Sequence, residues 1–547
     1  MDHNQNVAPS FSALLPDKRM SSEVNEYLEN VLENIGGCGR FQFFLNFFVL
    51  GTKTVVAWST LMMSFGGVVP DWTCTWNTDS GDKYMPNSTF VKQCSISNST
   101  INPICSSRQF DSSKSTVVSE WNLVCDKDWI VSTITTIQMG GLLVGAIISG
   151  QIGDVFGRRI TYYLSVIILM IANIVAAFSV NWKMFAALRF CIGLGCGWYL
   201  TVFGIFLAEL TPAKYRSFVL SFPTWAMGTM SFGLFSWILH DWMHLQIATA
   251  VFCVPWMLGF CLIPESYRWL VSNKKINEGH DVMARVAKIN HAPIPDKDKF
   301  LKIMETWGDV ADRRTYSVFD IVKHRKLLKT MLLLSVCWFS CGYGYYTISF
   351  GVEQLSGNLY VNMVLLGLMD MTSIFAAPLC NFAGRKWTTL VLFLIGGITG
   401  ITVGVFQFID IPNKGQLVNG FALASKVCVA TGWYGLWILT SESYPTVVRN
   451  VGLGVNNAMA RVGAMIAPQL VFASKHIPGI SYLLLGGCFF LSAFCILFLK
   501  ETNKQALQDS LEIVIPPPST EISVVSPTST TKQGEREGKT VDENQRL

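Results

Sequence analysis

The chain has 547 residues, of which half are hydrophobic and only 14% are charged, and its mean hydropathy is +0.37. A soluble protein of this length needs more charge on its surface, so the composition excludes a soluble globular protein and indicates a chain solvated mostly by lipid. The formal net charge of +5 is mild, and nucleic-acid binding is not needed to explain it.

Residues 1–40 are predicted to form a cytoplasmic N-terminal segment. They lack the basic start and the cleavage site of a signal peptide, so we expect the first span itself to direct insertion. Within this segment, the apolar residues of 22–35 recur with helical spacing, which predicts a helix lying along the membrane surface.

Apolar runs long enough to cross a bilayer, about 20 residues each, predict twelve membrane-spanning helices. Six are expected in residues 41–263, at 41–65, 130–152, 160–180, 184–208, 218–239 and 246–263. Six more are expected in residues 328–499, at 328–350, 359–382, 388–408, 418–440, 451–473 and 480–499.

The connecting segments differ in charge, which predicts their side of the membrane. Residues 70–128 contain five Lys/Arg and seven Asp/Glu, whereas residues 264–327 contain thirteen Lys/Arg and nine Asp/Glu. Because Lys and Arg are retained in the cytoplasm, 264–327 is predicted as a cytoplasmic central loop and 70–128 as a large external loop. Both termini are then cytoplasmic, and residues 500–547, rich in Ser, Thr, Pro and charge, are predicted as a disordered tail.

The predicted external loop carries the marks of an oxidising compartment. It contains an even number of cysteines, which are candidates for disulfides: Cys74, Cys94, Cys105 and Cys125. Three pairings are open, and the sequence does not choose between them. Two Asn-x-Ser/Thr triplets, at Asn87 and Asn98, are candidate glycosylation sites.

An internal repeat divides the chain into two six-helix halves. Its members are Gly150-x-x-x-Asp154-x-x-Gly157-Arg158-Arg159 with Gly384-Arg385-Lys386, Glu209-x-x-Pro212-x-x-x-Arg216 with Glu442-x-x-Pro445-x-x-x-Arg449, and Pro264-Glu265-Ser266 with Glu501-Thr502. The first two pairs lie 227 and 233 residues apart. Membrane transporters with paired halves bind substrate near the bilayer midplane, between the halves.

Over residues 36–502 these marks resemble the major facilitator superfamily, in which Asp-x-x-Gly-Arg-Arg is the most specific short motif. Within the superfamily the chain resembles the organic cation, anion and zwitterion (carnitine) transporters. The resemblance rests on Glu120-Trp121-Asn122-Leu123-Val124-Cys125, Pro264-Glu265-Ser266-Tyr267-Arg268-Trp269-Leu270 and the segment from Glu442 to Asn450. It implies the major facilitator fold, all-α with twelve transmembrane helices, and a multi-pass plasma-membrane transporter of small organic ions. The external loop has four cysteines where this family often has six.

Charged residues inside the spans are candidate functional groups, because a charge at the bilayer centre costs several kcal/mol unless it has a partner or faces water. Asp370 lies in the middle of the eighth predicted span. It is either a cavity carboxylate that attracts a cation or accepts a proton, or a buried partner of a nearby basic residue. In the resemblance, anion carriers have a Lys one turn later, where this chain has Ile374, which favours cations or zwitterions.

Arg461, in the eleventh predicted span, favours a substrate that carries a negative charge. A guanidinium holds a carboxylate bidentately, and the resemblance places Arg here in carnitine-type and anion carriers. Asp370 and Arg461 could therefore meet the two ends of a zwitterion, or pair with each other or with Lys426 as a gating salt bridge. Lys426 stands where the family usually has a Lys, sixteen residues before Glu442. Lys53, in the first span, has no counterpart in the resemblance, and either extends towards the membrane surface or faces the cavity.

Aromatic residues in the spans are candidates for binding an organic ammonium group by cation–π attraction, about 0.5–2 kcal/mol each. The same residues also fill helix interfaces and mark membrane boundaries. Those assigned to substrate binding, together with the charged residues above, are Trp198, Tyr199, Tyr346, Trp433 and Tyr434.

A further set of residues is predicted to act in conformational change and not in substrate binding. A carboxylate near a helix end can pair with basic residues of neighbouring spans and form a cytoplasmic latch that breaks as the halves rock. The set contains Gly150, Asp154, Gly157, Arg158, Arg159, Arg189, Glu209, Arg216, Glu265, Arg268, Arg385, Glu442 and Arg449.

The leading hypothesis at this stage is a secondary transporter of organic cations or zwitterions such as carnitine, working by alternating access. An organic anion transporter is the alternative, and a channel or a receptor that does not transport is the hypothesis from another class. An enzyme has no support, because the sequence has no Walker loop for ATP, no evident catalytic triad and no metal cluster. No cofactor is expected, and coupling to sodium or protons is left open.

Overall fold

The computed structural model describes residues 26–77, 83–84, 107–220, 222–310, 317–445 and 447–503. The predictions for Cys94, Cys105, Asn87, Asn98 and most of the 500–547 tail lie outside these residues.

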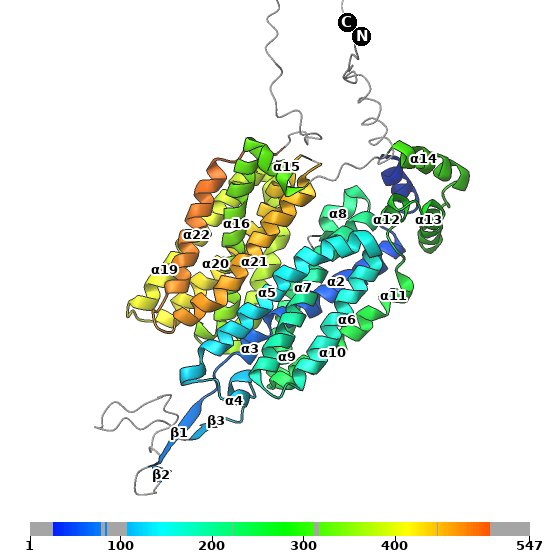
Figure 1. Cartoon of the computed structure of the whole chain (residues 1–547). Coiled ribbons are helices and arrows are strands. Elements are labelled where there is room, and N and C mark those ends of the chain that lie inside the picture. Colours follow the sequence, from blue (N-terminus) through cyan, green and yellow to red (C-terminus); the bar gives the residue numbers. More distant parts are fainter. Residues whose placement is uncertain are drawn as a thin grey trace, which may run out of the picture.

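The first half of the chain forms one helical bundle (Figure 1). Its elements are α2 (Arg40–Leu61), α3 (Met63–Gly66), α5 (Trp129–Phe156), α6 (Arg158–Ala177), α7 (Trp182–Leu210), α8 (Ala213–Leu220), α9 (Thr224–Leu239), α10 (Trp242–Met257) and α11 (Gly259–Leu262).

The second half forms a second bundle beside the first (Figure 1). Its elements are α16 (Arg325–Phe350), η3 (Gly351–Gln354), α17 (Leu359–Asp370), η4 (Met371–Phe375), α18 (Ala376–Ala383), α19 (Arg385–Phe408), α20 (Lys414–Ser443), α21 (Arg449–Ala473) and α22 (Ile480–Leu497).

The connecting segments mark the two ends of the molecule. At one end, called here the sheet end, lie α4 (Val117–Trp121), η2 (Cys125–Lys127) and an antiparallel sheet of β1 (Trp72–Asn77), β2 (Lys83–Tyr84) and β3 (Ser107–Phe110) in the order β2-β1-β3, with Trp72 opposite Phe110. At the other end, the α13 end, lie α12 (Tyr267–Ser272), α13 (Ile276–Asn290), α14 (Lys297–Val310) and α15 (Val318–Lys323). Figure 1 places the two groups at opposite ends of the bundles.

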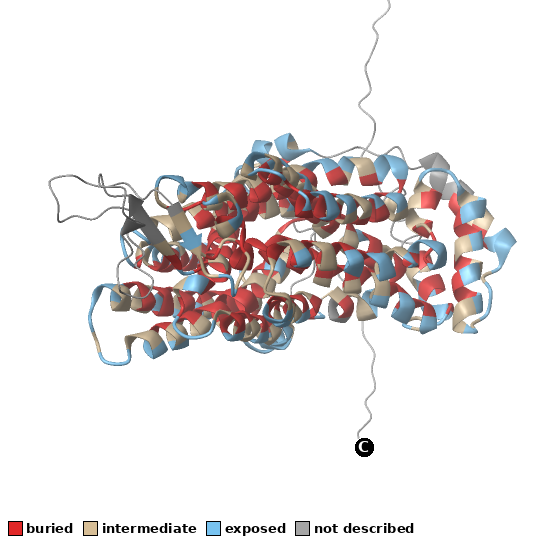
Figure 2. Ribbon diagram, turned by 90° about the horizontal axis from the view of Figure 1, so that it is seen from below, coloured by how far each residue is buried: buried red, intermediate tan, exposed pale blue. Residues whose placement is uncertain are grey.

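Ten helices of the described residues are long and apolar enough to cross a membrane. The two remaining predicted spans correspond to α9, which has only 16 residues, and to α21, which has 25 residues but contains Arg461 and several amide side chains. Large apolar side chains face outward on several of these helices, among them Ile147, Phe382 and Ile398. In Figure 2 the buried residues lie between the helices and the exposed ones on the outside. An outer surface of this kind suits lipid better than water.

Helix breaks interrupt two of the predicted spans. The fifth was predicted from 218, but α9 begins at Thr224 because Pro223 has no N–H and disfavours a helical residue before it. The eighth breaks directly after Asp370, where η4 separates α17 from α18. Pro378 explains this break, since its ring clashes with the carbonyl of Ile374 and leaves that carbonyl without its helical N–H donor.

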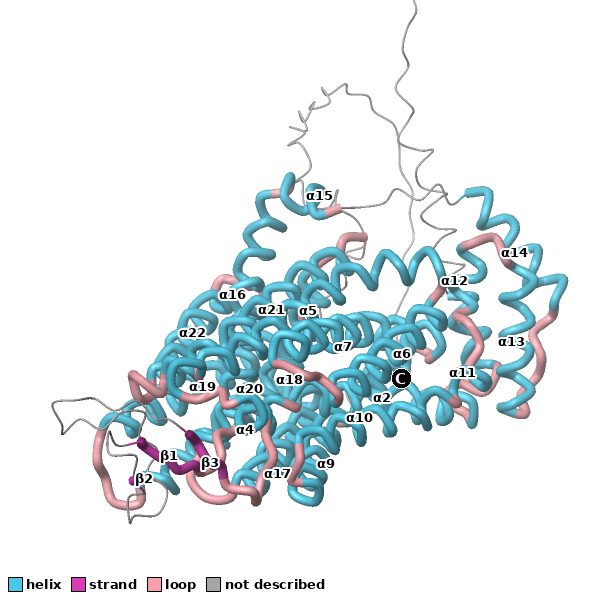
Figure 3. The backbone as a smooth tube through the Cα atoms, turned by 60° about the horizontal axis from the view of Figure 1, so that its bottom comes forward, coloured by secondary structure: helices cyan, strands magenta, loops and turns pink. Residues whose placement is uncertain are grey.

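The two halves meet through two pairs of helices. One pair is α5 with α21, and the other is α9 with α17; the elements around α17 and α9 lie together at the sheet end in Figure 3. Glycine permits the second approach, because a Cβ at Gly367 would lie 2.7 Å from the backbone N of Met230. The interface between the halves is therefore closely packed along these helices.

The helix over residues 26–34 does not expose an apolar face. Leu28, Leu32 and Ile35 are all buried within the protein, and Asn290 of α13 donates to the carbonyl of Ile35. The prediction that this segment lies along the membrane surface is wrong, because its apolar residues are covered by the chain itself.

Candidate functional site

A buried ion pair lies in the second half, at the break in the eighth span. Oδ1 of Asp370, the last residue of α17, is 3.4 Å from Nζ of Lys426 in α20, and both side chains are almost closed to solvent. Oδ2 of Asp370 accepts a 2.6 Å hydrogen bond from the Tyr345 hydroxyl. Both carboxylate oxygens are thus occupied by groups of the same half.

Lys426 is held in place by more than its carboxylate. It donates to Oγ of Ser349 at 2.8 Å, and its Nζ lies 3.3 Å from the centre of the Tyr345 ring. Ser349 and Tyr345 are one helical turn apart on α16. The ammonium therefore has an anion, a hydroxyl and a ring face as neighbours, which compensates its removal from water.

Two hydrogen bonds connect this cluster to the first half. Nε1 of Trp225 in α9 donates to Tyr345 Oη at 2.6 Å, and Oγ of Ser64 in α3 donates to the carbonyl of Ser349 at 3.0 Å. The sequence analysis did not single out either donor. The only sequence feature that marks Trp225 is the helix break at Pro223, two residues earlier. The ion pair of one half is therefore linked to the position of the other half.

Arg461 is also buried, in the middle of α21 and 7% exposed, but it has no acidic partner in the described part of the chain. Its guanidinium lies close enough to Tyr346 to interact with it electrostatically, and its Nε has no hydrogen-bond acceptor. Of the pairings considered from the sequence, the structure contains the one between Asp370 and Lys426. Arg461 is left with its charge uncompensated.

The aromatic candidates divide into two groups. Trp433 lies edge-on to Trp338 and Tyr345, with ring centres 5.9 Å apart in each case, and Tyr346 lies edge-on to Tyr345 at 5.3 Å. These rings surround the ion pair of the second half, and Tyr434 follows Trp433 on α20 as a half-buried residue.

The candidates of the first half lie in α7. Tyr199 is fully buried and donates to the carbonyl of Val49 at 2.6 Å, so its hydroxyl is used within its own half. Trp198 is buried and its Nε1 has no acceptor. Trp198 thus has a buried donor without an acceptor.

The halves are closed against each other at the sheet end. Ser132 of α5 donates to Gln469 of α21 at 3.3 Å, and Thr136 donates to the carbonyl of Met465 at 3.1 Å. The space between Ser64, Phe232 and Ser349 measures only about 10 Å³, barely enough for one water molecule.

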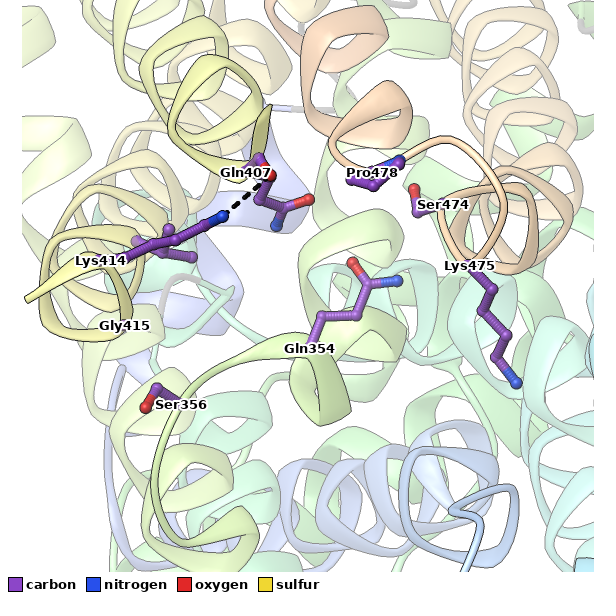
Figure 4. Close-up of a pocket in the computed structure, with 9 residues that line it drawn as sticks. Gln354, Ser356, Gln407, Lys414, Gly415, Ser474, Lys475 and Pro478 are labelled. Carbon is purple, nitrogen blue, oxygen red and sulfur yellow. Dashed lines mark hydrogen bonds between the residues drawn. The ribbon is translucent and has the colours of Figure 1, made fainter. Parts of the chain in front are cut away.

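A larger cavity of about 430 Å³ opens at the sheet end of the second half. Figure 4 shows its lining: Gln354 of η3, Gln407 of α19, Lys414 of α20, and Ser474, Lys475 and Pro478 between α21 and α22. Lys414 donates to the carbonyl of Gln407 at 3.1 Å, and Asp410 lies 3.8 Å from its Nζ. This cavity does not contain Asp370, Lys426 or Arg461.

At the α13 end, Glu265 caps the start of α6. Its carboxylate accepts from the backbone N–H groups of Arg158, at 2.9 Å, and Arg159, at 3.0 Å. Gly157, with φ of +99°, makes the turn, and a Cβ there would collide with the carboxylate. Burial raises the pKa of the Glu265 carboxyl, while the N–H groups that it accepts from act in the opposite direction.

The second half repeats this cap. Glu501 accepts from the N–H groups of Arg385, at 2.9 Å, and Lys386, at 3.2 Å. Gly384 has φ of +95°, and a Cβ there would lie 2.6 Å from Oε2 of Glu501. The internal repeat of the sequence therefore corresponds to one local structure that occurs twice.

The charged side chains of the repeat pair within their own halves. Arg158 lies 2.6 Å from Asp154 and 3.4 Å from Glu209, and Arg385 lies 3.1 Å from Glu442. Arg159 stacks over the Phe260 ring and donates to the Phe260 carbonyl. Arg449 donates to the carbonyl of Tyr444 at 3.4 Å.

Glu29 joins the cluster of the first half, and the sequence analysis missed it. Its Oε1 lies 2.9 Å from Nη2 of Arg216 and 2.6 Å from Nη2 of Arg268. Its Oε2 accepts from the N–H of Ala213 at 3.0 Å. No sequence motif marks Glu29, because its partners lie 187 and 239 residues away.

Two residues assigned to the conformational set, Arg189 and Gly150, take no part in these ion pairs or caps. Arg189 is buried in the first turns of α7, close to the sheet end, where it donates to the carbonyl of Ser59 and to Gln138. Because α7 starts at the sheet end, Arg189 lies about 30 Å from Glu209 along the helix. Gly150 has open space where a Cβ would stand, so it is not required for close packing.

Of the four cysteines assigned to disulfides, Cys125 is disulfide-bonded. The side chains of Cys74, Cys94 and Cys105 lie outside the description, so the pairing stays open. The eleven other cysteines of the chain are free.

The fold has known relatives among solved structures. The inward-open xylose transporter XylE of E. coli superposes with a TM-score of 0.62 over 85% of this chain and 98% of that chain, at 16% identity. This likeness confirms the predicted major facilitator fold of twelve helices. The molecule thus has the major facilitator fold, built from two helical halves.

Sequence comparisons define its family. Residues 47–512 match the family model described as sugar (and other) transporter. Mouse solute carrier family 22 member 4 is 30% identical over 73% of this chain and 72% of its own length. Human organic anion transporter 3 is 27% identical over 88% and 92%, and mouse organic cation/carnitine transporter 2 is 28% identical over 73% and 71%. The chain belongs to the organic ion transporters of the major facilitator superfamily, in solute carrier family 22.

Proposed function

We propose that this protein is a plasma-membrane secondary transporter of small organic anions, in which Arg461 holds the carboxylate of the substrate. The observation that carries the proposal is the contrast between two buried charges. Asp370 has Lys426 and Tyr345 as partners, whereas Arg461 has no acidic partner in the described part of the chain.

The contrast between these two buried charges argues against a simple organic cation as the substrate. A cationic substrate would have to displace Lys426 from Asp370 and leave that ammonium buried without its anion, which costs several kcal/mol. A carboxylate bound to Arg461 has the opposite effect, because it supplies the missing counter-charge and accepts two parallel N–H bonds. The sequence analysis favoured cations and zwitterions over anions because Ile374 stands where the resemblance places a Lys in anion carriers, and it left open whether Asp370 faces the substrate or pairs with a basic residue.

The relatives support an organic ion as substrate without selecting its charge. Their names include an organic anion transporter and an organic cation/carnitine transporter at similar identity. Ile374, at the position where anion carriers were expected to have a Lys, argues against an anion. Arg461 nevertheless supplies a positive charge that can bind an anion, whichever residue stands at position 374.

A zwitterion is the second candidate, and one contact favours it. Tyr346 interacts electrostatically with Arg461 and lies edge-on to Tyr345. An ammonium group held by these rings, with its carboxylate on Arg461, would satisfy both ends of a carnitine-like molecule.

The membrane orientation follows from the distribution of charge. The α13 end contains the basic segment 264–327, so we place it in the cytoplasm and the sheet end outside. The halves are closed at the sheet end, which makes this conformation the one that faces inward.

The test is uptake by cells that express the full chain, with labelled hippurate, carnitine and tetraethylammonium as anion, zwitterion and cation. We expect hippurate uptake, reduced at least about tenfold by Arg461→Gln and partly retained in Arg461→Lys. Arg325→Gln, an exposed arginine at the start of α16, is the control at equal surface expression. Uptake of tetraethylammonium alone would overturn the proposal, and uptake of carnitine alone would select the zwitterion.

A further inference from the structure

The cavity at the sheet end of the second half lies apart from the buried charges between the halves. Its lining comes from three turns of the second half and the helix ends beside them: the turn after η3, the turn between α19 and α20, and the turn between α21 and α22. With the sheet end placed outside, the cavity faces the external solution. Its volume of about 430 Å³ suits a small organic molecule.

Hydrogen bonds hold the walls of this cavity in place. Ser356, after η3, donates its N–H to Asn419 of α20 at 2.9 Å, and its carbonyl accepts from the Asn419 amide at 2.7 Å. Gly415 permits this approach, because a Cβ there would lie 2.5 Å from Oγ of Ser356. On the other side, Ser474 donates to Oγ of Ser481 at 2.8 Å and closes the turn between α21 and α22. The walls are thus already formed, so a ligand loses little free energy in ordering them.

The charge of the lining is positive. Its charged residues are Lys414 and Lys475, and no carboxylate lines the cavity in the described part of the chain. Lys414 is the first residue of α20, and Asn413 makes no side-chain capping bond to this helix. The unpaired N–H groups of a helix start add a partial positive charge. Lys475 stands exposed at the rim, and its side chain points away from the centre of the cavity (Figure 4).

The Lys414 ammonium remains available to an anion. The Asp410 carboxylate, 3.8 Å from Nζ of Lys414, is fully exposed, and exposed ion pairs of this kind contribute little. The other partner of Lys414 is the uncharged carbonyl of Gln407. An anion that enters the cavity therefore meets a cation without a strong counter-charge.

Two glutamines add neutral polar groups beside this cation. Gln354 donates from Nε2 to the carbonyl of Val471 at 3.1 Å, while its Oε1 has no hydrogen-bond donor in the described part of the chain. The side chains of Gln354 and Gln407 face each other in Figure 4. Amide groups pair with hydroxyl groups, since each amide both donates and accepts. This combination of a cation and amides suits an anion that also carries hydroxyl groups.

We propose that this cavity is an external binding site for small polyhydroxylated carboxylates, and that its occupation favours the conformation closed at the sheet end. Lys414 and the start of α20 hold the carboxylate, and Gln354, Gln407 and Ser356 pair with the hydroxyl groups. The site does not depend on the charge of the transported substrate, because none of the buried charges between the halves lines it.

The link to conformation runs through η3. Glu353, directly before Gln354, accepts from the N–H of Val69 in the first half at 3.4 Å. Opening of the sheet end separates the halves and breaks this bond. A ligand that holds Gln354 keeps η3 in the position in which the bond forms, so it binds the closed form more tightly and shifts the population towards it.

The binding test is calorimetric titration of the detergent-purified full chain at constant ionic strength. It compares three compounds with carbon chains of the same length: gluconate, sorbitol, which lacks the carboxylate, and hexanoate, which lacks the hydroxyl groups. We expect gluconate to bind at least about tenfold more tightly than either of the others. Lys414→Met should weaken gluconate binding at least about tenfold, and Lys414→Gln replaces it if the Met variant does not purify. Gln354→Leu should weaken the binding of gluconate but not of hexanoate.

Lys183→Met is the matched control, since Lys183 is an exposed lysine in the first turn of α7, at the sheet end of the first half. It should bind gluconate like the wild type. Equal binding of sorbitol, or full binding by the Lys414 variant, would overturn the role of the charge. Equal binding of hexanoate would overturn the role of the hydroxyl groups, and no binding of gluconate would overturn the site. These results leave the role of Arg461 in uptake untouched.

The conformational effect is measured on Ser132→Cys, whose thiol is buried against Gln469 in the closed form. In cells that express this variant, external gluconate should slow its reaction with an impermeant maleimide at least about twofold, and sorbitol should not. An unchanged rate at a gluconate concentration that saturates the purified protein would overturn the effect on conformation.

Discussion

Nζ of Lys426 lies 3.4 Å from Oδ1 of Asp370, although the two residues are more than fifty positions apart in the chain. This ion pair stands at the point where the eighth span changes from α-helix to 3₁₀-helix. It also connects, through Tyr345 and Ser349, to both hydrogen bonds that the first half donates to the cluster.

Removing one partner of this ion pair should destabilise the protein more than removing both partners. Asp370→Asn or Lys426→Met leaves one buried charge alone, which costs about 3–5 kcal/mol. We expect each single variant to lower surface expression and the melting temperature of the detergent-purified protein. The double variant should recover most of both losses. A double variant as unstable as the worse single one would contradict the pairing.

Substitution by alanine should harm the protein more at the turn glycines, Gly157 and Gly384, than at Gly150. Gly384→Ala places a Cβ 2.6 Å from the Glu501 carboxylate at a φ of +95°, and a left-handed backbone alone costs about 1–2 kcal/mol for a residue with a side chain. We expect a clear loss of surface expression for Gly384→Ala and Gly157→Ala. Gly150→Ala, where the space is open, should express like the wild type. Equal losses at all three positions would argue against the caps.

Glu29 should stabilise the α13 end of the first half. Glu29→Gln weakens the ion pairs to Arg216 and Arg268; since these groups are about one-quarter to one-third exposed, we expect a loss of roughly 1–2 kcal/mol. The measurement is the melting temperature of the purified protein. Glu33→Gln, an exposed residue one turn later in the same helix, is the matched control and should melt like the wild type.

Trp225 should favour the conformation that is closed at the sheet end. Trp225→Phe removes the hydrogen bond to Tyr345, worth about 0.5–1.5 kcal/mol, and shifts the population towards the open form by a few-fold. A cysteine at Ser132, which is buried against Gln469 in this conformation, should then react faster with an impermeant maleimide. Trp237→Phe, exposed in the same helix, should leave the rate unchanged.

The sequence predicted the helices and the repeat because both depend on local information. Hydrophobic length marks each span, and Gly157 and Gly384 mark turns that only a few residue types adopt. The helix at 26–34 was misplaced because its spacing shows an apolar face but not what covers it. The break after Asp370 was also missed, although Pro378 was visible, since the position of a 3₁₀ turn depends on packing.

The site was less predictable, because it depends on which helices become neighbours. Asp370, Lys426 and Arg461 were all recognised as buried charges, but their pairing is a property of how α17, α20 and α21 pack. Arg189 could have been placed correctly from topology alone. The fourth span enters from the sheet end, so a residue in its first turns cannot reach a cluster at the α13 end.

The charge clusters at the α13 end have a consequence for turnover. Among the described residues, the side-chain ion pairs at this end join groups of the same half, such as Arg158 with Glu209 and Arg385 with Glu442. The hydrogen bonds that do cross between the halves lie near the sheet end, and most of them are uncharged, such as that from Thr136 to Met465; the one from the Val69 N–H to the Glu353 carboxylate is also at that end. Salt screens charges but hardly affects neutral hydrogen bonds. The barrier to leaving this conformation should therefore depend on temperature and only weakly on cytoplasmic ionic strength.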